Sequence, residues 1–584
     1  TTAPYSRRNL KRCDALDYVE GASPTTMNTH IAPSNASGTY MHVTDNSKPV
    51  STESTEAQQW FDNGLAWLYG FNHVEAIHCF REALVHDPQL AIAHWGVGYA
   101  MGTNYNYPVI DDPQGAYKAA QMAVEMARKT KINGVEKDLI EALSVRYEET
   151  MHDSKKDSKK AQEQLCRLQT QYQLAMEKVY VKFCGEDSKN GGDPDVAALY
   201  AEAIMNRKPW ELWVPEPETG KPPEYSFVAQ RVLERHRKFF PKHPGLCHLY
   251  VHLMELSSTP EKALPAADVL RNDGGDTPGS GHLLHMASHI DMWVGAYANA
   301  IRANKLAHKS DQEYVRVTGR KGGFYASYRG HNIHFIAWAA MFDGQFKTAW
   351  DAGQRILECF DWDVVSEMPK YLESFRTVPL MVLIRFGKWK EIIDHPLPDA
   401  KRWPCILATQ RYARGVAFAA LGDVTNARIE QKLFLDMVHS NRYLHECMFV
   451  NNNVAWDPKG KCGSLNVGAA LLEGEILYRE HKFESAFKSL RDAVRLEDDL
   501  KYDEPWGWMQ PTRHALGALL NEQKRYGEAK SVFEADLKKW PKNLWATMGL
   551  MQSLKGLGNI EKAGKLEEEL KDLTRRADVS TDAA

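Results

Sequence analysis

The side chains in this sequence that are best suited to chemistry are histidines, and they are concentrated in its middle part. Nine of the 22 histidines lie between His243 and His334, where an even spread along the 584 residues would place about three or four. Neutral imidazole is a ligand for zinc, copper, iron and nickel, so a local excess of histidines raises the question of a metal site. The answer depends on whether their spacing brings the rings together.

The first histidine segment begins at a Pro-Gly pair, which favours a break in the chain followed by the start of a helix. Within this segment, His248, His252 and Glu255 occupy positions i, i+4 and i+7. This spacing places all three side chains on one face of a helix. The segment therefore predicts a helix that presents two imidazoles and a carboxylate in the same direction.

Two further segments repeat this pattern, and each follows a glycine. His282, His285 and His289 occupy positions i, i+3 and i+7, and His331 and His334 occupy positions i and i+3. Each segment predicts imidazoles on one helix face, near the N-terminal end of the helix. Since consecutive helices of a stacked repeat lie side by side, the three faces can converge.

A metal site is the interpretation that accounts for all three segments. A single buried histidine is more often a core residue with a satisfied hydrogen bond, but burying seven imidazoles together without a partner would leave many polar nitrogens unsatisfied. We expect one or two ions of iron, copper or zinc per chain, because a mainly imidazole site does not suit magnesium or calcium. The expected inner ligands are His248, His252, His285, His289, His331 and His334, with His282 and Glu255 as further ligands or as groups that orient the others.

The elements that must position these histidines are predicted to be helical repeats. From Trp60 to Trp95, small residues such as Gly64 and Ala83 recur with large ones such as Phe80. This is the tetratricopeptide pattern, in which small residues let two helices approach and large residues fill the gap. The pattern returns in residues 411–434, 469–496, 515–541 and 544–573. The predicted fold class is all-α: a tetratricopeptide-like superhelix of helix pairs, which can close around a central chamber.

Composition divides the chain into four predicted parts. Residues 1–54 are rich in Ser, Thr, Asn and Pro and are expected to form an extended or disordered arm. Residues 55–240 are expected to form N-terminal repeats, residues 241–350 a histidine-rich helical core, and residues 351–584 C-terminal repeats.

Several classes of protein are disfavoured by composition. The net charge of -4 and the lack of a basic stripe argue against a nucleic-acid partner. No apolar stretch reaches the 18 residues of a membrane span, and the nine cysteines contain no CxxC pair. We therefore expect a chain in the reducing cytoplasm without a membrane partner, although a removed targeting peptide would leave no trace. Walker, GxSxG and HExxH motifs do not occur.

At its histidine motifs the sequence resembles a family of tetratricopeptide-type proteins that is widespread in bacteria and also occurs in eukaryotes. The resemblance is carried in order by "WFDNGLAWLYGFNH", "HPGLCHLYVHLMEL", "GHLLHMASHIDMW", "YRGHNIHF" and "YDEPWGWMQPTRHALGALL", over about residues 56–550. Ala287 departs from the pattern, because relatives typically have proline there. The resemblance implies the repeat fold and the histidine motifs, but no settled activity. It also implies a role for Glu141, Glu202, Tyr502, Glu504 and His514, of which Glu141 and Glu202 can equally be salt-bridge residues on helix surfaces.

These observations leave two main hypotheses about function. The first is a metalloenzyme, an oxidoreductase or hydrolase that acts on a small molecule at a buried poly-histidine site. The second is a non-enzymatic scaffold for protein partners, with a structural metal or a polar histidine core. Metal storage or delivery is a third possibility, and no catalytic residue is assigned. Aromatic residues that would line a pocket, or else pack between repeats, are Trp95, Tyr105, Trp210, Trp293, Phe324, Tyr325, Trp506 and Trp508.

Overall fold

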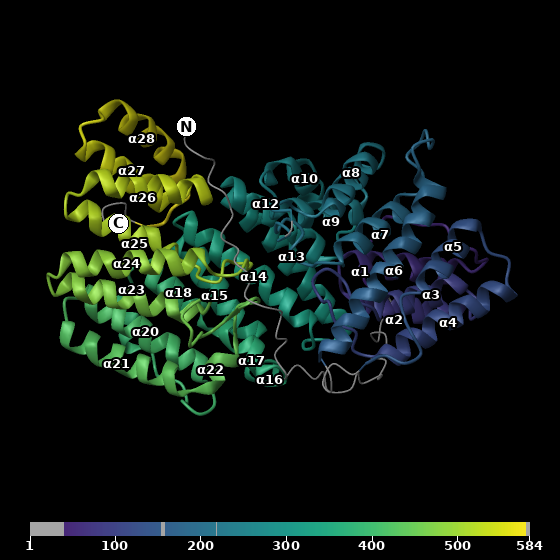
Figure 1. Cartoon of the computed structure of the whole chain (residues 1–584), viewed down its shortest axis with the longest axis horizontal. Coiled ribbons are helices and arrows are strands. Elements are labelled where there is room, and N and C mark those ends of the chain that lie inside the picture. Colours follow the sequence, from purple (N-terminus) through teal and green to yellow (C-terminus); the bar gives the residue numbers. More distant parts are fainter. Residues whose placement is uncertain (1–39, 153–157, 218, 580–584) are drawn as a thin grey trace. The chain divides into compact units, whose positions relative to one another are not determined.

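The computed structural model describes residues 40–152, 158–217 and 219–579, and nearly all regular structure in these ranges is helical (Figure 1). The one sheet in this part of the chain pairs two short antiparallel strands, β1 (Met448–Phe449) and β2 (Asn453–Val454). The predicted all-α class is therefore confirmed. Residues 1–39 of the predicted arm lie outside the described residues.

The described chain forms two compact units, and each is considered by itself. The N-terminal unit contains residues 40–290 and 306–320, and the C-terminal unit contains residues 291–305 and 321–579. The region predicted as a histidine-rich core thus contributes residues to both units.

The N-terminal unit is built from helices of different lengths, joined by turns and by longer loops. In chain order these are α1 (Thr55–Tyr69), α2 (His73–His86), α3 (Ala91–Ala100), α4 (Pro113–Lys129), α5 (Gly134–Leu143), α6 (Ser158–Cys184), α7 (Pro194–Met205), α8 (Glu224–Phe239), α9 (Pro244–Glu255), η1 (Pro260–Ala263), α10 (Leu264–Asp273) and α11 (Gly281–His285). Two helices contribute residues to both units: α12 (Ala287–Val294) and α13 (Tyr297–Thr318).

The C-terminal unit continues with helices of the same kind. They are α14 (Tyr325–Phe342), α15 (Phe346–Cys359), α16 (Trp362–Glu367), α17 (Pro369–Leu372), η2 (Glu373–Thr377), α18 (Val378–Arg385), α19 (Trp389–Asp394), α20 (Pro404–Ala420), α21 (Val424–Ser440), α22 (Arg442–Glu446), α23 (Ser464–Arg479), α24 (Phe483–Asp498), α25 (Thr512–Glu522), α26 (Tyr526–Lys539), α27 (Leu544–Gly556) and α28 (Ile560–Thr574).

Small and large residues fit together within the helix pairs in the way the repeat pattern predicts. A Cβ atom on Gly64 of α1 would lie only 2.6 Å from the Phe80 ring of α2, so the helices approach closely at this point. Gly517 and Phe533 stand in the same relation in α25 and α26, where the corresponding distance is 2.5 Å. The tetratricopeptide-like pairing therefore has the physical basis that the sequence suggested.

The turns inside the helix pairs share one conformation. In seven of them, the second residue after the first helix has a positive φ, the left-handed conformation that favours glycine. Glycine occupies this position in four turns. The others contain His481, Lys524 and Phe71, and Phe71 alone is both apolar and buried, with φ 55° and 4% exposure. An aromatic residue held in this conformation is unusual, and its surroundings are described below.

An extended segment precedes α1 and is fixed to the N-terminal unit by hydrogen bonds. The backbone N–H of Asp45 donates to the carbonyl of Asp276 over 2.9 Å. The Lys48 ammonium lies 2.8 Å from the carboxylates of both Asp193 and Asp195. The segment then ends at Ser54, whose side chain accepts a hydrogen bond from the first turn of α1.

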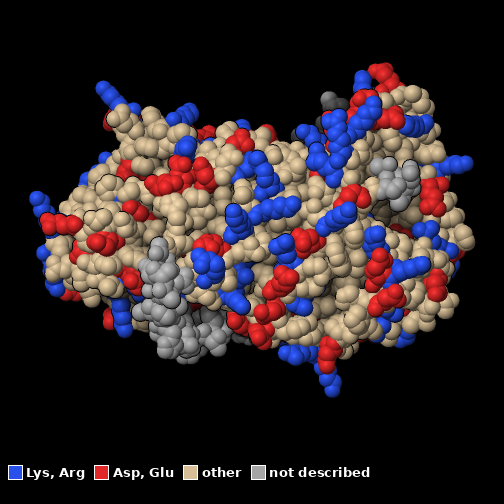
Figure 2. Space-filling model, turned by 180° about the vertical axis from the view of Figure 1, so that it is seen from behind, with Lys and Arg blue, Asp and Glu red and all other residues tan. Residues whose placement is uncertain are grey.

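The surface carries no large patch of one charge on the face shown in Figure 2, where Lys and Arg side chains are interspersed with Asp and Glu. This distribution agrees with the near-balanced net charge of -4. Among the helices described, none combines the length and the apolar character needed to cross a bilayer.

Candidate metal centre

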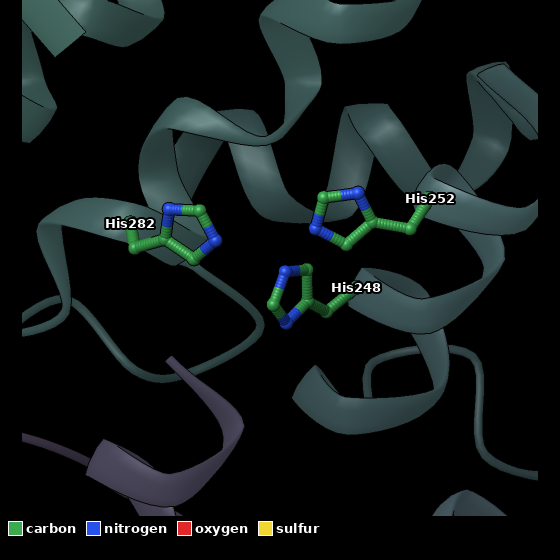
Figure 3. Close-up of side chains that lie close together, drawn as sticks. All are labelled: His248, His252 and His282. Atoms are coloured by element: carbon green, nitrogen blue, oxygen red, sulfur yellow. The ribbon is translucent and has the colours of Figure 1, made fainter. Parts of the chain in front are cut away.

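Three histidines of the N-terminal unit point toward one another from two helices (Figure 3). His248 and His252 lie one turn apart on α9, and His282 lies at the start of α11. Each offers one ring nitrogen, and these three atoms lie within 4.8 Å of one another. All three residues are about 1% exposed. We refer to them as the histidine triad.

His248 has one ring nitrogen fixed by the backbone and one that faces the triad. Its Nδ1 atom lies 2.6 Å from the carbonyl oxygen of Tyr69, so Nδ1 carries the proton and donates it. Its Nε2 atom is buried and has no hydrogen-bond partner among the described residues. Burial lowers the pKa of His248 well below its usual value, which keeps the ring neutral. A neutral ring with a buried, unpaired Nε2 lone pair is the form that binds a metal ion.

Glu255 orients His252 and connects it to a second histidine pair. Its Oε1 atom lies 2.8 Å from Nδ1 of His252, and its Oε2 atom lies 2.6 Å from Nδ1 of His289. An ionised carboxylate only accepts hydrogen bonds, so both rings donate from Nδ1. If these rings are neutral, the lone pair of each is on Nε2. This carboxylate–imidazole arrangement is the one that commonly fixes the tautomer of metal-binding histidines.

The second histidine pair, His285 and His289, lies one turn apart along the chain. Their Nε2 atoms are 2.7 Å apart. Because His289 donates from Nδ1 to Glu255, its Nε2 is the acceptor, and Nε2 of His285 carries the proton between them. The predicted i, i+4 pair is thus brought together, although Met286 separates α11 from α12.

Aromatic rings cover the triad on several sides. The Phe71 ring lies 4.4 Å from the His248 ring and is stacked on His252 at 6.0 Å. The rings of Tyr105 and Trp210 lie 5.0 Å and 5.9 Å from His252. Phe71 and Trp210 both have positive φ, at 55° and 65°. Non-glycine residues in this conformation concentrate at functional sites, where surrounding contacts outweigh the backbone cost.

The remaining predicted ligands, His331 and His334, lie on α14 in the C-terminal unit. The Nε2 atom of His334 is 2.9 Å from the sulfur of Met509, and burial lowers the pKa of His334 to about 3. The His331 ring lies 4.9 Å from Phe335, one helical turn away. Six of the eight candidate residues, including His282 and Glu255, thus belong to the N-terminal unit.

The residues that the family resemblance added have different surroundings. Glu141 is 63% exposed and lies 3.9 Å from Lys137, which fits the interpretation as a surface salt bridge. Glu202 is buried and accepts a hydrogen bond from the Tyr99 hydroxyl over 2.8 Å, so it is not a surface residue. In the C-terminal unit, Tyr502 donates to Glu504 and His514 pairs with Asp536.

Sequence reasoning did not identify two residues that contact the triad, Tyr69 and Phe71. Tyr69 contacts His248 through its backbone carbonyl, and a backbone contact cannot be predicted from the pattern of side chains in the sequence. Phe71 takes part through its ring, and a signal for it exists in the sequence. The matching position is glycine in four of the other six turns, as at Gly422 and Gly558, and a polar residue in the remaining two, so a phenylalanine there needs a tertiary explanation.

Other aromatic residues proposed for a pocket contact rings outside the triad. The Trp95 ring lies 5.2 Å from Tyr99, and Trp293 stacks on Trp540 at 5.1 Å. Tyr105 and Trp210 of this group are in ring contact with His252 of the triad.

Comparisons with known proteins identify solved structures with weak similarity to this chain, but they do not identify a family. No protein-family model and no curated protein matches the sequence. Among solved structures, yeast Tom70 is 13% identical with a TM-score of 0.30, covering 89% of this chain and 92% of Tom70. A human IFIT1 dimer with m7Gppp-AAAA is 11% identical with a TM-score of 0.30, covering 83% and 90%. TM-scores of 0.30 do not establish a shared fold or function. The assignment as an all-α protein of tetratricopeptide-like helix pairs therefore rests on the helix pairs themselves.

Proposed function

We propose that this chain binds one transition-metal ion at the histidine triad and acts as a metal-dependent enzyme on a small molecule. The observation that supports this most directly is that hydrogen bonds at Nδ1 fix the orientation of two triad rings and leave their Nε2 atoms facing the triad. Nδ1 of His248 is held by the Tyr69 carbonyl and Nδ1 of His252 by Glu255, so that Nε2 is the ligand atom of each. Such outer contacts are the usual companions of metal-binding histidines.

The dimensions of the triad agree with this proposal. Zinc–nitrogen distances of about 2.0–2.1 Å place neighbouring ligand atoms about 3.3 Å apart. The triad nitrogens lie within 4.8 Å, so the rings need to draw together by about 1.5 Å, which small side-chain rotations provide. The buried Glu255 carboxylate also supplies a negative charge beside the positive ion.

Three protein ligands are the number typical of catalytic zinc sites, in which the fourth position holds water or substrate. A metal ion in such a site supplies a polarised water or a redox centre. Zinc would indicate a hydrolase, whereas iron or copper would indicate an oxidoreductase. The chain's own contribution is to hold the three rings and to exclude water with Phe71, Tyr105 and Trp210.

A second candidate function is a scaffold for protein partners in which the metal has a structural role. The near-complete burial of the triad favours it, because structural sites are closed to solvent. The helix pairs also fit a role in protein–protein interaction. In this case the metal would stabilise the N-terminal unit without turning over a substrate.

The first experiment is metal analysis of the purified protein by inductively coupled plasma mass spectrometry. We expect about one equivalent of zinc, iron or copper per chain, and its loss in His248→Gln and His282→Gln. His236→Gln is the matched control, because His236 is equally buried in the same unit but lies on α8, where it contacts Tyr180. Metal-free wild type after reconstitution with each ion, or full metal content in both triad variants, would refute the proposal.

Cobalt substitution then separates the enzyme from the scaffold. A catalytic site with an open position changes its visible spectrum when azide or cyanide is added, whereas a closed structural site does not. An unchanged spectrum, together with a large loss of stability on metal removal, would establish the structural role.

A further inference from the structure

A second group of buried polar side chains lies in the N-terminal unit, around Arg146. This residue follows α5 and is 1% exposed. Its Nη2 atom donates to the carbonyl of Thr103 over 2.7 Å. Among the described residues, no carboxylate lies within 4.0 Å of the guanidinium, and its Nε and Nη1 atoms have no hydrogen-bond partner. A buried charge in this state is costly unless something else compensates it.

The guanidinium is held between two aromatic rings. Its central carbon lies 4.9 Å from the ring centre of Tyr99 on α3 and 4.8 Å from that of Tyr172 on α6. Both rings are fully buried. Cation–π contact on two sides fixes the position of the charge but satisfies none of its N–H groups in the plane of the guanidinium.

The same Tyr99 connects Arg146 to a buried carboxylate. The Tyr99 hydroxyl donates to Oε2 of Glu202 on α7 over 2.8 Å. Glu202 is 4% exposed, and its Oε1 atom has no hydrogen-bond partner among the described residues. Burial raises the pKa of Glu202 above its usual value. One tyrosine ring thus carries a guanidinium against its face and a carboxylate at its hydroxyl, and the two charges do not touch.

From this geometry we infer that Arg146 and Glu202 bind a small zwitterionic ligand of the amino-acid class. The carboxylate of the ligand accepts from Nε of Arg146, and its ammonium group donates to Oε1 of Glu202. Each buried charge then gains an opposite charge and a hydrogen bond. Ordered water would satisfy the same atoms without neutralising either charge, so it is the competing occupant. The inference does not depend on metal binding at the triad.

Isothermal titration calorimetry with glycine tests the inference, because glycine is the smallest molecule with both groups. We expect saturable binding by the full chain, and at least about tenfold weaker binding of acetate and of methylammonium, each of which contacts only one charge. Glu202→Gln should weaken glycine binding at least about tenfold and leave acetate binding unchanged. Arg146→Met should abolish the binding of both.

Two control variants show whether a loss of glycine binding is specific to the Arg146–Glu202 site. Arg167→Met removes an exposed arginine of α6 that pairs with Glu148, and it should bind glycine like the wild type. His282→Gln should also leave glycine binding unchanged, which separates this site from the metal site. If Arg146→Met does not fold, glycine binding by Glu202→Gln still tests the inference. Glutamine keeps the size of the side chain and can accept the hydrogen bond from Tyr99, so this variant should fold. No saturable binding, or a crystal structure with only water at Arg146 in the presence of glycine, would overturn the inference.

Discussion

The Nδ1 atom of His252 lies 2.8 Å from Oε1 of Glu255, three residues further along the same helix. The second oxygen of this carboxylate lies 2.6 Å from His289. One buried side chain therefore sets the tautomers of histidines from two segments that are more than thirty residues apart. Both carboxylate oxygens of Glu255 face imidazole Nδ1 atoms, so under the proposed metal binding Glu255 would orient rings.

Glu255→Gln should weaken metal binding about 10- to 100-fold without removing a triad ring. An amide has a single acceptor oxygen, so it cannot accept from both His252 and His289, and one ring must change its tautomer. Competition titration of zinc against a chromophoric chelator measures the change. Glu234→Gln is the control, because Glu234 lies on α8 and accepts from the Tyr250 hydroxyl rather than from a histidine of the triad. Equal zinc affinity of the wild type and Glu255→Gln would show that the carboxylate does not orient the site.

Phe71 and Lys524 occupy the same left-handed turn position, so replacing each by glycine should have opposite effects. Lys524→Gly relieves backbone strain and should raise the free energy of unfolding by about 1 kcal/mol. Phe71→Gly relieves the same strain but removes a buried ring that contacts His248 and His252, and it should lower stability by about 2–4 kcal/mol. Urea unfolding followed by circular dichroism measures both. If Phe71→Gly were as stabilising as Lys524→Gly, the ring would contribute nothing to the site.

Acid should destabilise the N-terminal unit through His236 before the carboxylates titrate. Burial lowers the pKa of His236 from 6.5 to about 4, so between these values the unfolded chain binds a proton that the folded chain does not. Stability therefore falls as the pH drops from about 6.5 to about 4 and shows no further change from this group below that. The loss should be about 1–3 kcal/mol.

His236→Gln can still bond to Tyr180 and should show a shallower loss of stability across this pH range. Thermal unfolding at half-unit pH steps, compared with the wild type, measures the difference. Parallel pH profiles of the two proteins would mean that His236 takes up its proton in the folded state as easily as in the unfolded state.

Gly64→Ala should be destabilising although alanine is the better helix former. The added methyl group would lie 2.6 Å from the Phe80 ring and would force α1 and α2 apart, at a cost of about 1–3 kcal/mol. Gly527→Ala in α26 is the matched control, because nothing lies within 4 Å of its new Cβ atom. It should raise stability by about 0.5–1 kcal/mol. Similar shifts in melting temperature for both variants would contradict the close packing of α1 on α2.

The sequence by itself determined the class of fold and the helical segments that carry the clustered histidines. Helix pairs could be predicted because the alternation of small and large residues, as at Gly64 and Phe80, operates within one pair and is local in sequence. The pairing of His248 with His252 followed from helical spacing for the same reason.

Only the tertiary structure decided which histidines meet and what surrounds them. His282 completes the triad, and the Tyr69 carbonyl that fixes His248 lies 179 residues away along the chain. The spacing of residues within one helix defines a face but not the element packed against it. The contacts of Arg146 with Tyr99, Tyr172 and Thr103 likewise join separate elements of the N-terminal unit, so no periodicity in the sequence reports them.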